Sequence, residues 1–176
     1  MPVQTSYPGD ALLQEGKPLR LSTKSRYGTR AVLDIATHSH QGPVTLNDIS
    51  ARQEISKKYL EQIVHRLLKV GLLVSVRGPQ GGYLLAKTPA RIRLGEIIRA
   101  LDGPVAPVRC VDEPRICDRA RHCVTRHVWS EIKQSVEAVI DRITIADLTS
   151  RQSGVDGLLS PTRKTKRGPA RPTKSR

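Results

Sequence analysis

Residues 48–87 read DISARQEISKKYLEQIVHRLLKVGLLVSVRGPQGGYLLAK, and the spacing of their apolar side chains changes partway along from helical to alternating. From Ser56 to Gly71, apolar residues recur at three and four positions, which places them on one face of a helix. They are Leu60, Ile63, Val64, Leu67 and Leu68. Beyond Gly71, apolar residues alternate on either side of RGPQGG, the pattern of a two-stranded hairpin.

A second, shorter helix precedes this one. Thr45 is followed three residues later by Asp48, a spacing typical of a capping box at the start of a helix. Ser56 then predicts the N-cap of the next helix. Two short helices joined by a tight turn indicate a helix-turn-helix, and a hairpin directly after the second helix makes it a winged helix.

Helical spacing also occurs on both sides of this unit. Ser22 begins a helix predicted to end near His38, and residues 88–103 predict another that Gly103 and Pro104 stop. A long amphipathic helix is predicted over residues 124–148. Its apolar positions are Val128, Ile132, Val136, Val139, Ile140 and Ile143. Because the helix is longer than a small core needs, we expect a homodimer interface; the alternative is that it packs entirely on its own chain.

The predicted fold is mainly α with a small β-wing: a winged helix-turn-helix followed by a long C-terminal dimerisation helix. Its parts are a disordered arm at 1–20, the DNA-binding domain at 21–103, a cysteine loop at 104–123, the dimerisation helix at 124–148 and a disordered basic tail at 149–176. The tail has no apolar anchor and predicts a non-specific tether to DNA; a merely solubilising tail is the alternative.

The formal net charge of +14 points to a polyanionic partner, with nucleic acid first, because clustered Lys and Arg neutralise phosphates and release counterions. A basic protein with no such partner is the alternative. No run approaches the roughly 18 to 20 apolar residues of a membrane span, and residues 1–20 show no secretory pattern, so we expect a cytoplasmic protein. No recognisable motif assembles a nucleophile, a base and an orienting carboxylate, which argues against an enzyme.

All three cysteines fall in one short basic segment. Six residues separate Cys110 from Cys117 and five separate Cys117 from Cys123, whereas paired ligands of structural zinc are usually closer in sequence. The longer spacing and the all-thiol donor set favour an iron–sulfur cluster, 2Fe-2S or 4Fe-4S. Nearby arginines favour thiolates and offset cluster charge. They are Arg109, Arg115, Arg119 and Arg121. A thiol redox switch and a zinc site remain as alternatives.

Four segments resemble, in order, the Rrf-type winged-helix transcription regulators. They are RLSTKSRYGTRAVLDIATHS at 20–39, the quoted stretch at 48–87, RLGEIIRALDG at 93–103, and CVTRHVWSEIK with ITIADL between 123 and 148. The resemblance covers about residues 19–148. It implies a dimeric bacterial DNA-binding regulator whose three-cysteine loop, in many members, holds an iron–sulfur cluster.

The resemblance also bears on the fourth ligand of such a cluster. Members that bind a cluster often place a histidine three residues after the last cysteine, but this chain has Arg126 there, and a guanidinium cannot donate a lone pair to iron. His127 lies one residue further on, one helical turn beyond Cys123, and is the predicted ligand ahead of His122. A non-protein ligand or an open iron site is the alternative.

The predicted DNA-reading surface is the polar face of the helix that begins at Ser56, together with the wing and the start of the first helix. The residues assigned to it are Lys24, Arg26, Arg30, Lys57, Lys58, Tyr59, Glu61, Gln62, His65 and Arg77. An ordinary solvated helix face is the first alternative. A winged helix that binds a protein partner in place of DNA is the second.

Overall fold

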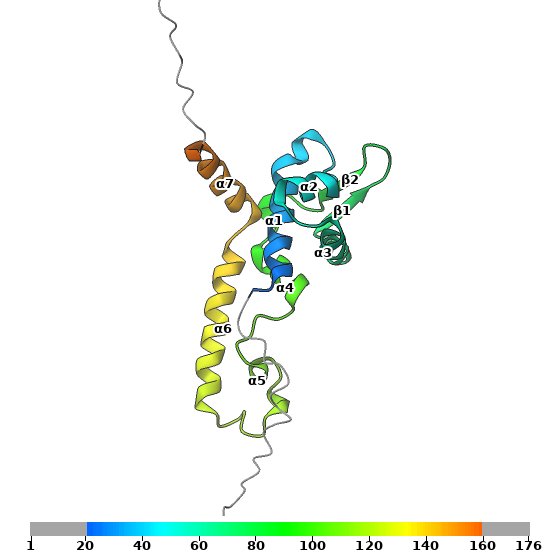
Figure 1. The fold of residues 1–176 in the computed structure, drawn as a ribbon. Helices are drawn as coiled ribbons and strands as arrows, with labels where there is room; N and C mark the ends of the chain where they lie inside the picture. The colour runs from blue at the N-terminus through cyan, green and yellow to red at the C-terminus, as the bar shows by residue number, and fades with distance from the viewer. Residues whose placement is uncertain (1–20, 160–176) are drawn as a thin grey trace, which may run out of the picture.

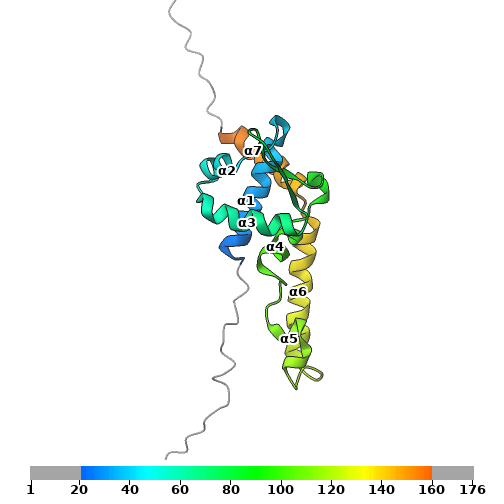
Figure 2. The ribbon, with the colours of Figure 1, turned by 90° about the vertical axis from the view of Figure 1, so that its right-hand side faces the viewer.

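The computed structural model describes the backbone of residues 21–159 and the side chains of residues 21–154. A compact head carries the wing, α6 extends away from it, and the cysteine loop lies at the far end of α6 (Figures 1 and 2). The elements in order are α1 Thr23–His38, η1 Ser39–Gln41, α2 Leu46–Gln53, α3 Lys57–Lys69, β1 Leu73–Val76, β2 Gly82–Leu85, η2 Pro89–Arg91, α4 Leu94–Asp102, α5 Arg109–Asp112, η3 Pro114–Ile116, α6 Val124–Arg142 and α7 Ile145–Leu159. Across these residues, no helix is both long and apolar enough to cross a lipid bilayer.

The first helix begins where the sequence predicts. Ser22 is the N-cap of α1, and its hydroxyl oxygen accepts a hydrogen bond from the Ser25 backbone N–H at 3.2 Å. The Ser22 backbone N–H and hydroxyl both donate to the carboxylate of Asp102 at the end of α4. The same short segment therefore caps α1 and ties it to α4.

The helix-turn-helix forms as predicted, with one difference in capping. The Thr45 hydroxyl donates to the Asp48 carboxylate at 2.7 Å, and this bond, with that from the Thr45 backbone N–H, lowers the pKa of Asp48. The Asp48 backbone N–H donates in turn to the Thr45 hydroxyl oxygen at 3.2 Å. Ser56 occupies the N-cap position of α3, but its side chain makes no capping hydrogen bond. The predicted boundary is confirmed, while the predicted role of the Ser56 side chain is wrong.

The wing follows directly from the end of α3. Gly71 adopts a left-handed φ of 68°, and the N–H groups of Gly71 and Leu72 donate back to Leu68 and Leu67, which ends the helix in a Schellman motif. β1 and β2 then pair antiparallel, with Leu73 opposite Leu85, so the predicted hairpin is confirmed.

A bridge between Val44 and Tyr83 joins the wing to the start of the helix-turn-helix. The two residues exchange backbone hydrogen bonds of 3.0 and 2.8 Å. A Cβ at Gly82 would stand 2.6 Å from the Val44 carbonyl oxygen, so only glycine allows the two segments to approach this closely. The sequence pattern does not predict this pairing, because the partners are distant in the chain.

The core of the head lies between α1, α3 and α4, with α2, β1 and the start of α7 around it. The largest fully buried side chains are Ile35, Ile49, Leu60, Ile63, Leu67, Leu73, Ile92, Ile97, Ile98 and Ile145. α1 and α4 meet closely at Gly28, where a Cβ would stand 2.2 Å from a methyl group of Leu101. The apolar face predicted for the helix that begins at Ser56 is the face that α3 contributes to this core.

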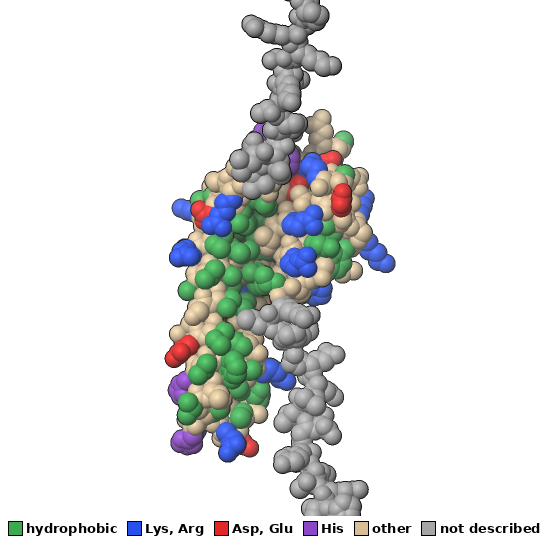
Figure 3. Space-filling model, turned by 60° about the vertical axis from the view of Figure 1, so that its left-hand side comes forward, with side chains coloured by type: hydrophobic (Ala, Val, Ile, Leu, Met, Phe, Trp, Pro, Cys, Tyr) green, Lys and Arg blue, Asp and Glu red, His purple; other side chains and the backbone are tan. Residues whose placement is uncertain are grey.

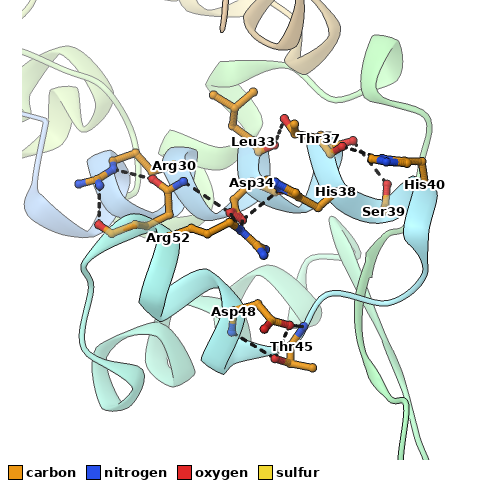
Figure 4. A network of polar contacts seen from close by, with 12 residues as sticks. Arg30, Leu33, Asp34, Thr37, His38, Ser39, His40, Thr45, Asp48 and Arg52 are labelled. Atoms are coloured by element: carbon orange, nitrogen blue, oxygen red, sulfur yellow. Dashed lines mark hydrogen bonds and ion pairs between the residues drawn. The ribbon is translucent and has the colours of Figure 1, made fainter. Parts of the chain in front are cut away.

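One carboxylate is fully buried beside this core. The Asp34 side chain has no exposed area, and both of its oxygens accept from Arg52 Nε, at 2.9 and 2.8 Å (Figure 4). These bonds raise the pKa of the Arg52 guanidinium. The pair joins α1 to α2 and fixes the first half of the helix-turn-helix on the core.

The long helix differs from the prediction. A single helix was expected over residues 124–148 and a disordered tail from 149, but α6 ends at Arg142 and α7 runs from Ile145 to Leu159. The break occurs because Thr144 and Asp147 form a second capping box: the Thr144 backbone N–H donates to the Asp147 carboxylate at 2.8 Å, and the Asp147 N–H donates to the Thr144 hydroxyl at 3.1 Å. The predicted arm at 1–20 and the tail beyond Leu159 lie outside the described residues.

We expect replacement of Asp34 by alanine to lower the free energy of unfolding by about 2–3 kcal/mol, because it removes the charge-assisted hydrogen bonds to Arg52 from a buried site. Urea denaturation at neutral pH measures the loss. Asp118→Ala, at an exposed position of the cysteine loop, is the matched control and should change the value by less than about 0.5 kcal/mol. Equal stabilities for the two variants would contradict this role for Asp34.

Candidate DNA interface and cysteine loop

The outer face of α3 is polar and exposed, as predicted. Its inner face buries Leu60, Ile63, Val64 and Leu67 in the core. The exposed residues are Lys57, Lys58, Glu61, Gln62 and His65. These side chains carry both hydrogen-bond donors and acceptors, the groups that read base edges in a major groove.

The start of α1 brings a further cation beside α3. Lys24 lines a hollow of about 240 Å³ together with Gln62, His65 and Arg66. Arg66 donates to the Leu101 carbonyl oxygen at 3.1 Å, which ties α3 to the end of α4. The structure therefore gathers three of the predicted DNA contacts, Lys24, Gln62 and His65, in one place.

Two predicted contacts are engaged within the head. The Tyr59 ring is half-buried against the core and meets Tyr27 edge to face, with ring centroids 5.9 Å apart. Arg30 Nε donates to the Gln53 side chain at 3.0 Å, and the guanidinium lies 5.5 Å from the centre of the Tyr27 ring. Arg26, at the start of α1, is exposed.

Arg77 lies at the beginning of the wing loop and is exposed. The following residue, Gly78, has a φ of 120°, and its carbonyl oxygen accepts from the Gly81 N–H at 2.9 Å. A Cβ at Gly81 would stand 2.3 Å from the Val76 carbonyl oxygen. Glycines are thus required for a narrow loop that presents Arg77 outward.

The cysteine loop contains a single helical turn, α5, and the short helix η3. Cys110, Cys117 and Cys123 are half-buried, and none is in a disulfide. Among the residues that the structure describes, no three His, Cys, Asp or Glu side chains lie close enough together to hold one metal ion. His127 and His122 are both exposed near the start of α6.

The surroundings of Cys123 favour its thiolate form. It is the N-cap residue of α6, and its sulfur lies 3.1 Å from the Thr125 hydroxyl. The Thr125 hydroxyl, followed by the Arg126 backbone N–H and the nearby charge of Arg119, lowers the pKa of the Cys123 thiol. A thiolate is the form of cysteine that binds metals and reacts with oxidants.

The donor set of this loop fits an iron–sulfur cluster better than a single ion. Three thiols are present, one has a lowered pKa, and all three lie in one loop. A cluster is wider than one ion, so its ligands need not converge on a single point. The side chains of Arg126 and Lys133 hold α5 against α6, a role not predicted from the sequence. No spacing along the chain pairs either residue with its partner in α5, so the sequence carried no signal for these contacts.

α6 keeps part of its apolar stripe exposed. Ile140 is buried against Ile98 and Val105 of the head, with Val136 packed beside them. The exposed apolar residues of α6 are Val124, Val128, Trp129, Ile132 and Val139. Figure 3 shows apolar side chains, in green, gathered along the extended half of the molecule. Within the part of the chain that the structure describes, this portion of the stripe is thus not covered by other residues.

A helix-turn-helix with an exposed polar second helix and a glycine-rich wing defines a winged-helix protein of the DNA-binding type. The model of the family described as "Rrf2: Iron-dependent Transcriptional regulator" matches residues 21–151. The chain belongs to the Rrf2 family, as the sequence predicted. The family consists of transcriptional regulators, which also confirms the prediction of a non-enzymatic protein.

Relatives and solved structures agree with this assignment. The chain is 44% identical over 134 residues to the HTH-type transcriptional regulator IscR of Erwinia tasmaniensis, covering 76% of this chain and 81% of the relative. It is similar to the structure of T. potens IscR, with a TM-score of 0.65, 42% identity, and coverage of 77% and 90%. It is also similar to CymR, the global cysteine regulator of B. subtilis, with a TM-score of 0.63, 37% identity, and coverage of 75% and 97%.

Proposed function

We propose that the chain acts as a homodimeric regulator whose binding to operator DNA is modulated by an iron–sulfur cluster held by Cys110, Cys117 and Cys123. The observation that carries the proposal is the course of α6. This helix packs on the DNA-binding head at one end and carries the three-cysteine loop at the other. A change in the loop thus acts on the helix that positions the head.

In this proposal α3 enters the major groove and the wing lies beside it. Gln62 pairs with an adenine edge, and Glu61 accepts from a cytosine amino group. Arg77 contacts phosphate or the minor groove. Lys24, near Gln62 and His65 in the structure, adds a phosphate contact that fixes the register of the head on the duplex.

A second copy of the chain covers the exposed part of the α6 stripe. Val128 and Val139 are 47% and 48% exposed and lie on the same helix. Exposed apolar side chains that lie together on one surface mark a protein–protein contact. A symmetric dimer buries the same patch of both copies and sets the spacing of two reading heads. The distance between the two heads then determines the spacing of the operator half-sites that the dimer can bind.

Three contacts make α6 and the head move as one unit. Arg99 of α4 donates to both carboxylate oxygens of Asp141, at 2.6 and 3.2 Å, and the Leu94 N–H donates to the Ile143 carbonyl oxygen at 2.9 Å. A Cβ at Gly95 would stand 2.0 Å from Asp141, so the glycine makes room for this pair. Displacement of the far end of α6 therefore changes the spacing between the two heads of a dimer.

The cysteine thiolates hold the cluster, with His127 as the fourth protein ligand. When bound, an iron–sulfur cluster supplies redox chemistry and reactivity toward oxygen and nitric oxide, so its presence reports iron supply or either gas. The chain's own contribution is to supply thiolates: the Thr125 hydroxyl and the Arg126 backbone N–H stabilise the thiolate of Cys123.

A thiol redox switch without iron is the second candidate. The lowered pKa of Cys123 favours it, because a thiolate is the species that is oxidised first. In this alternative, oxidation of the loop replaces the cluster as the signal. The two candidates share the DNA interface and differ in the cofactor alone.

Variants of the two kinds of DNA contact should behave differently. We expect Arg77→Ala to weaken binding to all sequences and to reduce the slope of log affinity against log salt by about one, since it removes a phosphate contact. Gln62→Ala should relax preference at one base pair, a loss of about 1–3 kcal/mol of discrimination. Titration of operator and scrambled duplexes at several salt concentrations measures both effects.

Arg142→Ala is the control, since Arg142 is exposed at the C-terminal end of α6 and outside the proposed DNA contacts. It should leave the salt slope and the base discrimination unchanged. Equal losses across all sequences for Gln62→Ala and Arg77→Ala would contradict the assigned roles.

The cofactor is tested by anaerobic reconstitution of the full chain, followed by absorption spectroscopy and analysis of iron and sulfide. We expect a coloured protein with matching iron and sulfide contents. His127→Ala should shift the absorption and electron paramagnetic resonance spectra and speed loss of the cluster in air, because a protein ligand is removed. His122→Ala is the matched control and should do neither. A colourless protein after reconstitution would favour the thiol switch, and an unchanged spectrum in His127→Ala would exclude that ligand.

A further inference from the structure

Arg126 connects the first and third cysteines through their backbone carbonyls. Its backbone N–H donates to the Cys123 carbonyl oxygen at 3.2 Å, within the first turn of α6. Its side-chain Nε donates to the Cys110 carbonyl oxygen at 2.9 Å, sixteen residues away in the chain. The two ends of the cysteine loop thus meet at one residue.

A second contact orients the same arm of the loop. Lys133 lies two helical turns after Arg126, on the same face of α6. Its ammonium group contacts the carboxylate of Asp112, the last residue of α5, at 2.5 Å. The two side chains are about one-quarter exposed, so this ion pair is better shielded from solvent than one on an open surface. α5 is therefore held at two points along α6.

The middle cysteine has no such anchor among the contacts of the described residues. The Cys117 N–H donates to the Pro114 carbonyl oxygen, and the Cys117 carbonyl oxygen accepts from the Ala120 N–H. Both hydrogen bonds lie within the loop itself. Ala120 is buried, but it belongs to the same segment. The loop consists of one fixed arm at Cys110, one fixed end at Cys123, and a local turn between them.

We propose that Arg126 is a positioning residue that holds Cys110 at a set separation from Cys123 before any cofactor binds. A guanidinium suits this task, since it stays charged at any physiological pH and its rigid planar group reaches a carbonyl that a shorter side chain on the same helix turn would not. Prior placement of two of the three thiols lowers the entropic cost of closing the loop around a bound group. The inference rests on the proposed function only for the identity of that group.

Hydrogen exchange of the full chain without cofactor, under reducing anaerobic conditions, tests this role directly. The Glu113 N–H, which donates to the Arg109 carbonyl oxygen at 2.9 Å, reports whether α5 is closed. Arg126→Ala should speed exchange of this amide by about 3-fold to 10-fold, the effect of losing one hydrogen bond of ordinary net strength at a partly exposed site. Arg126→Lys should give a smaller increase. Unchanged exchange in Arg126→Ala would overturn the proposal.

Two further variants separate this role from a general loss of structure. Lys133→Met should speed exchange of the same amide through loss of the Asp112 contact, whereas Arg142→Ala, on the same helix, should not. Exchange in α1 and α3 should stay unchanged in every variant, so faster exchange in those helices would mean unfolding and would overturn the assignment. A chain that shows the predicted exchange but takes up no cluster would disprove the proposed cofactor and leave the role of Arg126 standing.

Discussion

Burial of one face of α3 against α1 and α4 is the constraint on which the rest of the structure depends. Leu60 and Leu67 are fully buried, and the close crossing at Gly28 lets Leu101 and Ile63 pack beside α1. Because these residues fix the rotation of α3 about its axis, the opposite face is presented to solvent with Gln62 and Lys58 exposed. The polar face proposed to read DNA is thus a consequence of core packing. The buried pair of Asp34 and Arg52 then holds α2 in the position that completes the motif.

The same packing fixes one end of α6 to the head. Ile92 and Ile145 are both fully buried, and the Ile145 N–H donates to the Ile92 carbonyl oxygen at 2.9 Å. The corner between α6 and α7 is therefore part of the head, while the start of α6 lies far from it beside the cysteine loop (Figure 1). α6 is thus joined to the head at one end and to the cysteine loop at the other. Coupling of this kind needs two arrangements of the loop and a rigid connection, and the fold supplies the connection.

The sequence predicts the features that depend on neighbours along the chain. The capping box of Thr45 and Asp48, the end of α3 at Gly71 and the hairpin all follow from local patterns, and the structure confirms them. The break at Thr144 had the same local signal, but apolar spacing that continued through Ile140 and Ile143 suggested one unbroken helix. Contacts between distant segments could not be predicted, because no spacing pairs Arg126 with Cys110, or Val44 with Tyr83.

The central claim is that the state of the cysteine loop changes the affinity for operator DNA. The most direct measurement compares operator binding by cluster-loaded and cofactor-free protein, prepared anaerobically from one batch and titrated at matched salt. The account predicts affinities that differ by about 5-fold or more, the usual range of coupling between two sites, and a smaller difference on non-specific DNA. Equal operator affinities for the two forms would contradict it.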